Sequence, residues 1–277
     1  MSGADLSLGL QALTQGHGAW ALLGVAAFLA GGLNAVAGGG SFLTFPALVF
    51  TGVPPVVANA TSALAVSPGY LGSVWGLRLE LAALPRQQVH REALLAASGG
   101  LVGAGLLLVT PASVFAGLVP WLLLLATVLF AAGPWLQARG AARRAPALAG
   151  ANAGAPAQAA PHPWRGPGLW LVAVYGGYFN GGLGILLMAL YTLTGETRLH
   201  TANALKNLNS FVLSLLSVAA FAWAGAIAWP QALLMMAGAT AGGLAGARLS
   251  RRLSARAVRV LVLVTGSVMT VVFFARR

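Results

Sequence analysis

Residues 37–70 read AGGGSFLTFPALVFTGVPPVVANATSALAVSPGY, and this stretch decides the fold. A glycine run precedes the apolar segment Ser41 to Thr51, which is shorter than the roughly 20 residues that a helix needs to cross a bilayer. Two prolines, Pro54 and Pro55, then lead into a second apolar run that begins at Val57. A short apolar segment between glycines and prolines predicts a half-length or re-entrant helix inside a membrane.

The composition places the whole chain in a membrane. Of 277 residues, 58% are hydrophobic and 7% are charged, whereas an ordinary soluble domain has about 25% charged residues. The mean hydropathy of +0.82 is spread over nearly the whole length, which excludes a secreted domain behind a signal peptide and a soluble domain on one anchor. The chain contains no cysteine, so disulfides, thiol catalysis and thiolate metal sites are excluded.

We predict an all-α, polytopic membrane protein with eight spanning helices and two short, glycine-flanked half-helices. The segments Ser41 to Thr51 and Gly184 to Thr194 are too short to span at 1.5 Å per residue. The runs that approach span length are Ala19 to Val36, Val57 to Arg78, Glu92 to Val109, Val114 to Leu136, the shorter Gly168 to Asn180, Leu199 to Trp223, Gln231 to Ala247 and Ala257 to Phe274.

The distribution of arginine predicts the orientation, because basic residues of short loops stay in the cytoplasm. The chain has 16 basic and 4 acidic residues, and its arginines fall between the apolar runs, which favours a membrane protein over a nucleic-acid-binding one. The loops 78–91 and 248–256 are expected inside and both termini outside. We predict a first transmembrane repeat (1–136), a flexible cytoplasmic linker rich in Ala, Pro and Gly (137–167) and a second, inverted repeat (168–277).

The two halves of the chain resemble one another. Residues 37–39 precede the first short segment as residues 180–182 precede the second, and both segments end in Thr-Gly at the same offset of 143 residues. Since the charge pattern makes the two short helices run in opposite directions, we predict inverted repeats. Glycines at every fourth position also predict close helix packing in both halves: Gly99 and Gly103, then Gly238, Gly242 and Gly246.

Inverted repeats with glycine-interrupted segments at matching positions indicate a secondary transporter and point to its binding site. A half-length helix that starts inside the membrane leaves its first N–H groups unpaired, and its dipole adds about half a positive charge there. Gly38, Gly39 and Gly40, with Gly181 and Gly182, let a ligand approach the backbone. The Ser41 hydroxyl is expected to cap its helix or to donate to the ligand. The predicted ligand is an anion.

Residues 37–70 and the stretch GLGILLMALYTLTGETRLHTANALKNLNSF (182–211) resemble the sulfite exporter TauE/SafE family of membrane transporters. The likeness is closer in the first half, and Gly184 stands where that half has Ser41. The resemblance implies an inner-membrane protein that moves small sulfur oxyanions or organosulfonates, mostly outward. It also implies functional roles at the positions that match the family: Gly38, Gly39, Gly40, Ser41, Asn59, Thr61, Asn203, Lys206 and Asn207.

Lys206, the only lysine, is the strongest candidate for a charged ligand contact. It lies about 12 Å deeper than Arg198 along a continuous helix, and shares a face with Asn203, Asn207 and Ser210. An ionisable group inside the membrane is costly without a partner, and an anionic substrate would supply the missing charge. The alternative is that Lys206 snorkels to the interface or bonds helix-end carbonyls.

Asn59 and Ser62 occupy the repeat positions of Asn203 and Lys206, and with Thr61 they are candidates to donate to the oxygens of an oxyanion. Their alternative role is to cap the helix or to join it to its neighbour.

Other polar residues are expected outside the site. Asn34 and Asn180, which end the helices before the glycine turns, are expected to satisfy freed backbone groups. Glu80, Glu92 and Glu196 are expected in loops, so the sequence predicts no buried carboxylate for proton coupling and leaves the coupling mechanism open.

An intramembrane enzyme is the competing class. Ser41 is followed by Phe42 rather than by the glycine of a Gly-x-Ser-Gly turn, His90 is followed by Arg91 rather than by the glutamate of H-E-x-x-H, and no phosphate-binding loop motif occurs. We therefore expect no enzyme activity, catalytic residue, metal or cofactor. The expected partners are a small anion and the lipid bilayer, without nucleic acid and with homo-oligomers left open. An anion channel, or an importer of another small anion, is the alternative function.

Overall fold

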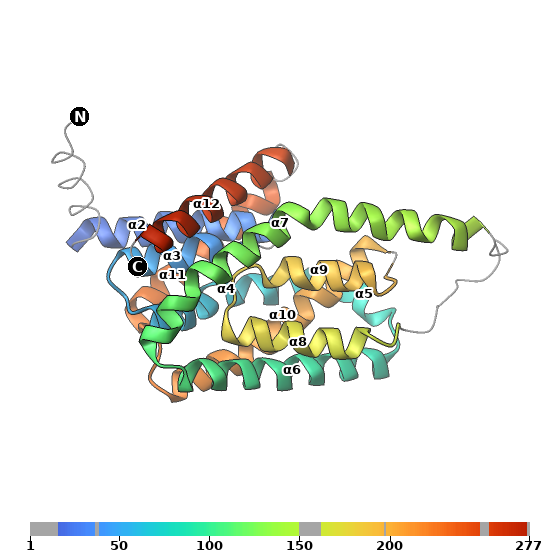
Figure 1. The fold of residues 1–277 in the computed structure, drawn as a ribbon, viewed down its shortest axis with the longest axis horizontal. Coiled ribbons are helices and arrows are strands. Elements are labelled where there is room, and N and C mark those ends of the chain that lie inside the picture. Colours follow the sequence, from blue (N-terminus) through green and yellow to red (C-terminus); the bar gives the residue numbers. More distant parts are fainter. Residues whose placement is uncertain (1–15, 37–38, 150–161, 197, 250–254, 276–277) are drawn as a thin grey trace.

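The structure, a computed structural model, describes residues 16–36, 39–149, 162–196, 198–249 and 255–275. Over these ranges all regular elements are helices, which confirms the predicted all-α class (Figure 1). Gly38, residues 150–161 of the linker and both termini lie outside the described residues. The helices are α2 (Gly16–Val36), α3 (Ser41–Phe50), α4 (Pro55–Gly76), α5 (Arg78–Ala82), α6 (Arg86–Val109), α7 (Ala112–Ala149), α8 (Arg165–Tyr178), α9 (Leu183–Leu193), α10 (Leu199–Trp223), α11 (Trp229–Leu249) and α12 (Ala255–Ala275).

The helices at the predicted spans differ in length. Four are long and apolar enough to cross a membrane: Gly16–Asn34, Arg86–Val109, Ala112–Gly133 and Leu199–Trp223. The 14 residues of α8 are about 21 Å long at 1.5 Å per residue, whereas the hydrocarbon core is about 30 Å thick. The predicted run, Gly168 to Asn180, is already shorter than a span; α8 begins three residues earlier, at Arg165, and ends where the backbone becomes extended at Phe179, so the segment stays short.

The outer surface of the bundle is apolar. Large side chains that a soluble protein would bury are exposed, among them Val109 of α6 (77%) and Val271 of α12 (66%). Trp75, Trp164 and Trp223 lie at or beside helix ends with 71%, 70% and 95% of their surface exposed. An apolar surface with exposed tryptophans at helix ends is typical of a protein that faces lipid.

Both predicted half-length helices are present. α3 follows Gly40 and α9 follows Gly182, close to the starts expected from the glycine pattern. Gly182 has a φ of +78°, a left-handed conformation that residues with a β-carbon rarely adopt, so glycine is required at this turn. The cap positions Gly40 and Gly182 carry no side chain to bond the first N–H groups of α3 and α9.

Small residues hold two helix pairs in backbone contact, as the glycine spacing predicted. In the pair α6 and α8, a β-carbon on Gly103 would collide with the Val174 carbonyl oxygen. In the pair α2 and α11, a β-carbon on Gly242 would collide with the Phe28 carbonyl oxygen. Residue numbers rise together along both contacts. From α11 to α2 the pairs are Gly238 with Gly24, Gly242 with Phe28 and Gly246 with Gly32; from α6 to α8 they are Gly99 with Ala173 and Gly103 with Tyr178. The helices of each pair are therefore parallel.

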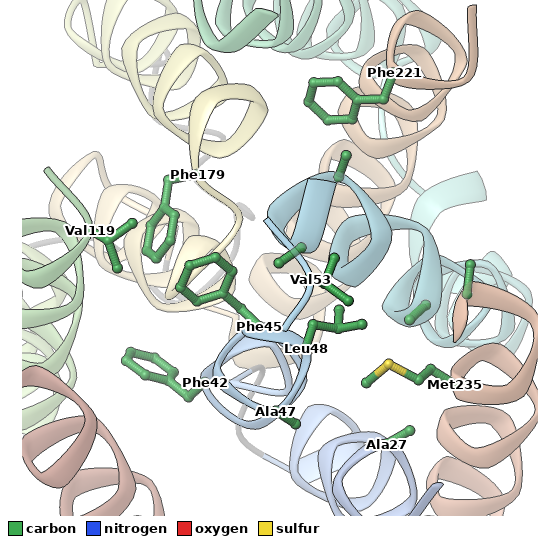
Figure 2. Packing of buried hydrophobic residues seen from close by; sticks show 14 of the residues in the cluster. Ala27, Phe42, Phe45, Ala47, Leu48, Val53, Val119, Phe179, Phe221 and Met235 are labelled. Carbon is green, nitrogen blue, oxygen red and sulfur yellow. The ribbon is translucent and has the colours of Figure 1, made fainter. Parts of the chain in front are cut away.

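The largest hydrophobic cluster surrounds α3. Phe45 packs edge-on against Phe179 at 5.5 Å between ring centroids and stacks on Phe273 of α12 at 6.0 Å. Figure 2 shows Phe42 and Phe45 on the side of α3 that faces Phe179, just after α8, and Val119 of α7. A half-length helix that is buried by several neighbours leaves its first turn fixed in the middle of the molecule.

The helix α7 is longer than predicted. It continues from Ala112 to Ala149, so the first part of the connection 137–167 is helical rather than an irregular linker. Figure 1 shows this end of α7 extending beyond the neighbouring helices.

Candidate functional site

A side chain from the first turn of one half-length helix reaches the start of the other. The ring of Phe42, in the first turn of α3, is 3.8 Å from the position of a β-carbon on Gly182, which precedes α9. That β-carbon would also lie 2.9 Å from the β-carbon of Ala126 on α7. At the start of α3, a β-carbon on Gly40 would lie 2.8 Å from the Ala30 carbonyl oxygen. The glycines thus allow both helix starts to be enclosed by neighbouring helices.

Both half-length helices start without a side-chain cap bond, and anion binding at these starts stays a prediction. The first bonds of α3 are tight, with the Leu43 N–H donating to Gly40 O at 3.0 Å, and Ile185 N–H donates to Gly182 O at 3.0 Å in α9. Ser41 is buried as the first residue of α3 and does not stand at the cap position. Preceding carbonyls accept from several of the first N–H groups, so the positive end of each helix dipole and the absence of a side-chain cap are what favour a negative ligand here.

The candidate residues of α4 are buried and bond to other helices. The Asn59 side-chain amide donates to Tyr178 O at 3.1 Å, immediately before the second glycine turn. Ser62 and Thr44 share a hydroxyl hydrogen bond of 2.6 Å, which ties α4 to the first turn of α3. Thr61 accepts from the Ala228 N–H at 3.0 Å. In this conformation the three residues join helices around the site, and their contact with an anion stays a prediction.

The candidate residues of α10 form a buried polar face. Lys206 is 7% exposed, and within the described residues no carboxylate forms an ion pair with it. The Asn207 amide donates to Asn203 O at 2.9 Å. The hydroxyl oxygens of Ser210 and Ser214 are buried without a hydrogen-bond partner in the described part of the chain. The buried face of α10 therefore carries the Lys206 ammonium and two hydroxyl groups, Ser210 and Ser214, that make no hydrogen bond with a described residue.

Asn180 does not have the role expected of it. Its side chain is 3% exposed and lies beside the Tyr70 hydroxyl, yet neither amide atom makes a well-formed hydrogen bond with a described residue. The following turn is held instead by the Tyr175 hydroxyl, which donates to Gly181 O at 2.7 Å. The Asn180 amide is therefore a further buried polar group next to the start of α9.

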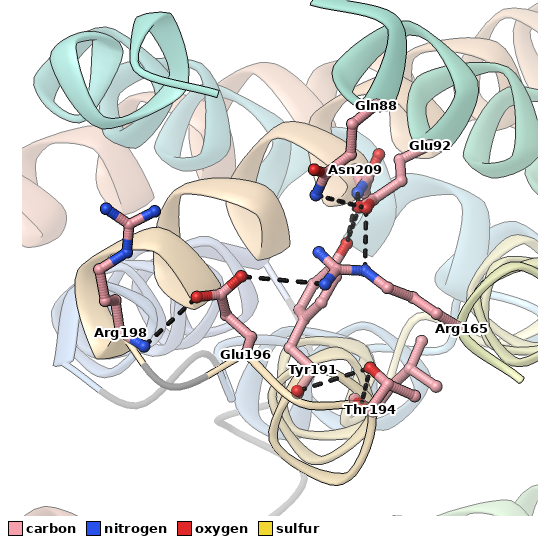
Figure 3. A network of polar contacts seen from close by, with 9 residues as sticks. Gln88, Glu92, Arg165, Tyr191, Thr194, Glu196, Arg198 and Asn209 are labelled. Carbon is pink, nitrogen blue, oxygen red and sulfur yellow. Dashed lines mark hydrogen bonds and ion pairs between the residues drawn. The ribbon is translucent and has the colours of Figure 1, made fainter. Parts of the chain in front are cut away.

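A second polar cluster, centred on Glu92, was not predicted. Glu92 was expected in a loop, but it lies in the second turn of α6 and is 5% exposed. Figure 3 shows its carboxylate among side chains that come from α8, α9 and α10. Arg165 Nε donates to Oε1 at 3.0 Å and the Tyr191 hydroxyl donates to Oε2 at 2.8 Å. Asn209 Nδ2 also donates to Oε2, at 3.3 Å. We call Gln88, Glu92, Arg165, Tyr191 and Asn209 the Glu92 cluster.

Further contacts tie the Glu92 cluster together. Gln88 Nε2 donates to Glu92 Oε1 at 3.3 Å, one turn earlier on α6. The Arg165 guanidinium lies 5.0 Å above the Tyr191 ring and 3.8 Å from Glu196 Oε2. A sequence signal for the burial existed, because Glu92, Ala96, Gly99 and Gly103 share the packed face of one helix. The partners themselves are far away in sequence, so periodicity alone did not identify them.

Comparisons with known proteins agree with a transporter. The model of the family "Sulfite exporter TauE/SafE" matches residues 23–273. A probable membrane transporter protein of Haemophilus influenzae is 28% identical over 252 residues, covering 90% of this chain and 92% of the relative. A probable membrane transporter protein, ORF9, of a Sinorhizobium species is 27% identical and covers 88% of both chains.

The probable membrane transporter protein YfcA of Escherichia coli is 26% identical over 260 residues, covering 90% of this chain and 88% of the relative. No solved structure matches the chain. Since the family model extends over nearly every helix described above, the chain belongs to the sulfite exporter TauE/SafE family and is a membrane transporter.

Proposed function

We propose that this protein is a secondary transporter that exports small sulfur-containing anions, sulfite or organosulfonates, across the bacterial inner membrane. The observation that carries the proposal is the meeting of two uncapped, glycine-flanked helix starts, α3 and α9, in the interior of the molecule. The name of the matching family and the names of the bacterial relatives support export and membrane transport.

The two halves form inverted repeats in this proposal. Matching helices pack in matching ways: α2 runs parallel to α11 as α8 runs parallel to α6, and α3 precedes α4 as α9 precedes α10. α2 with α3 and α8 with α9 then enter the membrane from opposite sides, so that both half-helices start near mid-membrane. This arrangement is the usual setting of the binding site in transporters with inverted repeats.

The anion is held by backbone N–H groups at the two helix starts and neutralised by Lys206. A compact oxyanion suits such a site, because several oxygens accept from donors that arrive from different helices. The buried ammonium has no carboxylate partner among the described residues, so the anion removes the cost of an uncompensated charge. Transport involves no catalytic residue and no cofactor in this account.

A thermal-stability screen of the purified protein tests the proposed ligand class. Sulfite, sulfate, thiosulfate, taurine, sulfoacetate and carboxylate analogues are added in turn, and a ligand that binds only the native state raises the melting temperature by mass action. We expect stabilisation by sulfite or a sulfonate and none by carboxylate analogues of matched size. Stabilisation by carboxylates alone would assign the protein to a different substrate class.

A further inference from the structure

Glu92 is a buried carboxylate for which the proposed anion site has no use. It is 5% exposed, whereas Glu80 and Glu196, the other described acidic residues, are more exposed. Its helix, α6, is one of those long and apolar enough to cross a membrane. Ionisable groups in such segments are costly and are typical of ion pathways and proton relays.

The hydrogen bonds of the Glu92 cluster fix the charge state of this carboxylate. Both oxygens act as acceptors, Oε1 toward Arg165 and Gln88, and Oε2 toward Tyr191 and Asn209. A protonated carboxyl would carry a hydrogen where one of these groups now donates, and would lose acceptor capacity. Assembly of the cluster therefore requires the unprotonated form. Separation of the cluster leaves a buried carboxylate that a proton neutralises.

The donors come from the elements that build the anion site. α9 begins at that site, after Gly182, and carries Tyr191 near its other end. α10 carries Lys206 one turn before Asn209. A shift of α9 or α10 when the anion binds or leaves would change the bonds to Glu92. The anion site and the Glu92 cluster are thus linked through short stretches of these two helices.

The charge around Glu92 leaves room for one proton. Arg165 is the cation that ion-pairs with Glu92 in the described part of the chain, and withdrawing it leaves the Glu92 carboxylate unpaired, whereas Arg165 itself keeps Glu196 Oε2 at 3.8 Å. Arg165 of α8 and Tyr191 of α9 contact Glu92, and Glu196 lies beyond Arg165. Further charged and titratable groups on the surrounding helices are Lys206 of α10, one turn before Asn209, and the exposed His90 and Arg91 of α6 itself.

The Glu92 cluster, which joins α6 of the first half to α8, α9 and α10, has no counterpart at the matching positions of α3 and α4. At the repeat offsets, Tyr191 corresponds to Leu48 and Asn209 to Ala65, both fully buried in the hydrophobic core. The matching place in the other half is thus closed by apolar packing, and a chain has one such carboxylate rather than a symmetric pair.

We propose that Glu92 is a proton-binding site that couples anion export to proton entry. The inference rests on the proposed function. Over one transport cycle a proton moves from outer to inner water by way of a carboxylate oxygen of Glu92, which is protonated while the cluster is apart and unprotonated once Arg165, Tyr191 and Asn209 close around it. No bond within the anion forms or breaks. The conformation described here is the closed, unprotonated state.

Proteoliposomes with an acidic interior and a neutral exterior test the coupling, with the membrane potential clamped by potassium and valinomycin. Radiolabelled sulfite is added outside, and counterflow against internal sulfite is measured separately without a pH gradient. The parent protein is expected to accumulate sulfite inside the acidic vesicles. Passive diffusion of a weak acid would act in the opposite direction, toward the alkaline side.

Glu92→Gln is expected to abolish this accumulation and to retain counterflow, because exchange of anions needs no proton. Glu92→Asp keeps a carboxylate and is expected to retain part of the accumulation. Glu80→Gln, the same change at a carboxylate outside the cluster, is the matched control and is expected to behave as the parent. If Glu92→Gln fails to fold, the double variant that combines Glu92→Gln with Arg165→Gln is used in its place, because it removes both buried charges.

Each result decides a separate claim. Accumulation by Glu92→Gln at the parent level would overturn the proposal. The same result is expected if the substrate, rather than Glu92, carries the proton, so that case also counts against the proposal. Loss of counterflow in both the single and the double variant would show a structural role for the cluster and would also overturn it. Counterflow by the parent without pH-driven accumulation would refute the coupling alone, whereas absence of counterflow in the parent counts against the proposed function.

Discussion

At the scale of residues, Lys206 is the buried cation on which the proposed anion binding depends. Lys206 lies on α10 with 7% of its surface exposed and without an ion-pair partner in the described chain. A buried cation of this kind does not stabilise an empty protein, because desolvation costs more than any contact returns. In the proposed function, a negatively charged ligand supplies the charge that Lys206 lacks.

Lys206→Met is expected to weaken anion binding while the protein still folds. Methionine keeps the length and apolar character of the side chain, and removes only the charge. Loss of a charge-assisted hydrogen bond costs about 1.5 to 3 kcal/mol, which corresponds to roughly ten- to a hundredfold in affinity. Binding is measured by thermal shift over a range of sulfite concentrations, with the melting temperature of the unliganded protein as the folding control.

The matched variant Lys206→Arg restores the charge with a different shape. A planar guanidinium does not replace a compact ammonium in a close-fitting site, so we expect only partial recovery of binding. If Lys206→Met binds sulfite as well as the parent does, the lysine has no ligand role, and the site depends on the backbone N–H groups alone.

The residues that sequence could predict are those whose role depends on local pattern. Gly182 was found because a glycine pair precedes a short apolar run, and Lys206 because it is the only lysine in an apolar helix. Glu92 was placed in a loop because it stands at the edge of its apolar run. Its partners Arg165, Tyr191 and Asn209 are 73, 99 and 117 residues away, and no local pattern connects them.

At the scale of elements, the contact between α6 and α8 depends on the absence of a side chain at Gly103. A β-carbon there would collide with the Val174 carbonyl oxygen and lie 2.7 Å from the Tyr178 backbone nitrogen. Gly105, two residues further on the same helix, has no atom within 4 Å of its β-carbon position. The two glycines therefore separate the effect of packing from that of helix propensity.

Gly103→Ala is expected to lower stability by about 1–3 kcal/mol, the usual cost of forcing atoms into a packed interface. Gly105→Ala is expected to raise it by about 0.5–1 kcal/mol, because alanine favours the helix. Thermal unfolding of both variants in the same detergent measures the difference. Equal shifts in the same direction would contradict the parallel contact of α6 and α8.

Existence of the helices was easier to predict than their ends. The half-length helices α3 and α9 followed from glycines before a short apolar run, and the structure places their starts at Gly40 and Gly182. The end of α8 was missed because Phe179 is as apolar as the helix before it and hydropathy does not register the extended backbone. α7 continues to Ala149 because alanine and arginine favour a helix although they do not form an apolar span.

At the scale of the whole molecule, the orientation is a prediction from arginine distribution. The natural chain has no cysteine, so one introduced cysteine is the only target for a thiol reagent. Ala149→Cys, at the end of α7, is expected to be unreactive toward an impermeant reagent applied to intact cells. Ser113→Cys, exposed at the other end of α7, is expected to react. The reverse pattern would show that the chain is inserted the other way round.

Counterflow of sulfite tests the central claim, that this protein is a carrier for small sulfur anions, most directly. Purified protein is reconstituted into vesicles loaded with unlabelled sulfite, and these are diluted into buffer with trace radiolabelled sulfite. A carrier with alternating access exchanges the two pools, so we predict a transient, saturable accumulation of label above its external concentration. Simple equilibration of label without such accumulation would indicate a channel, and no uptake beyond protein-free vesicles would contradict transport of this anion.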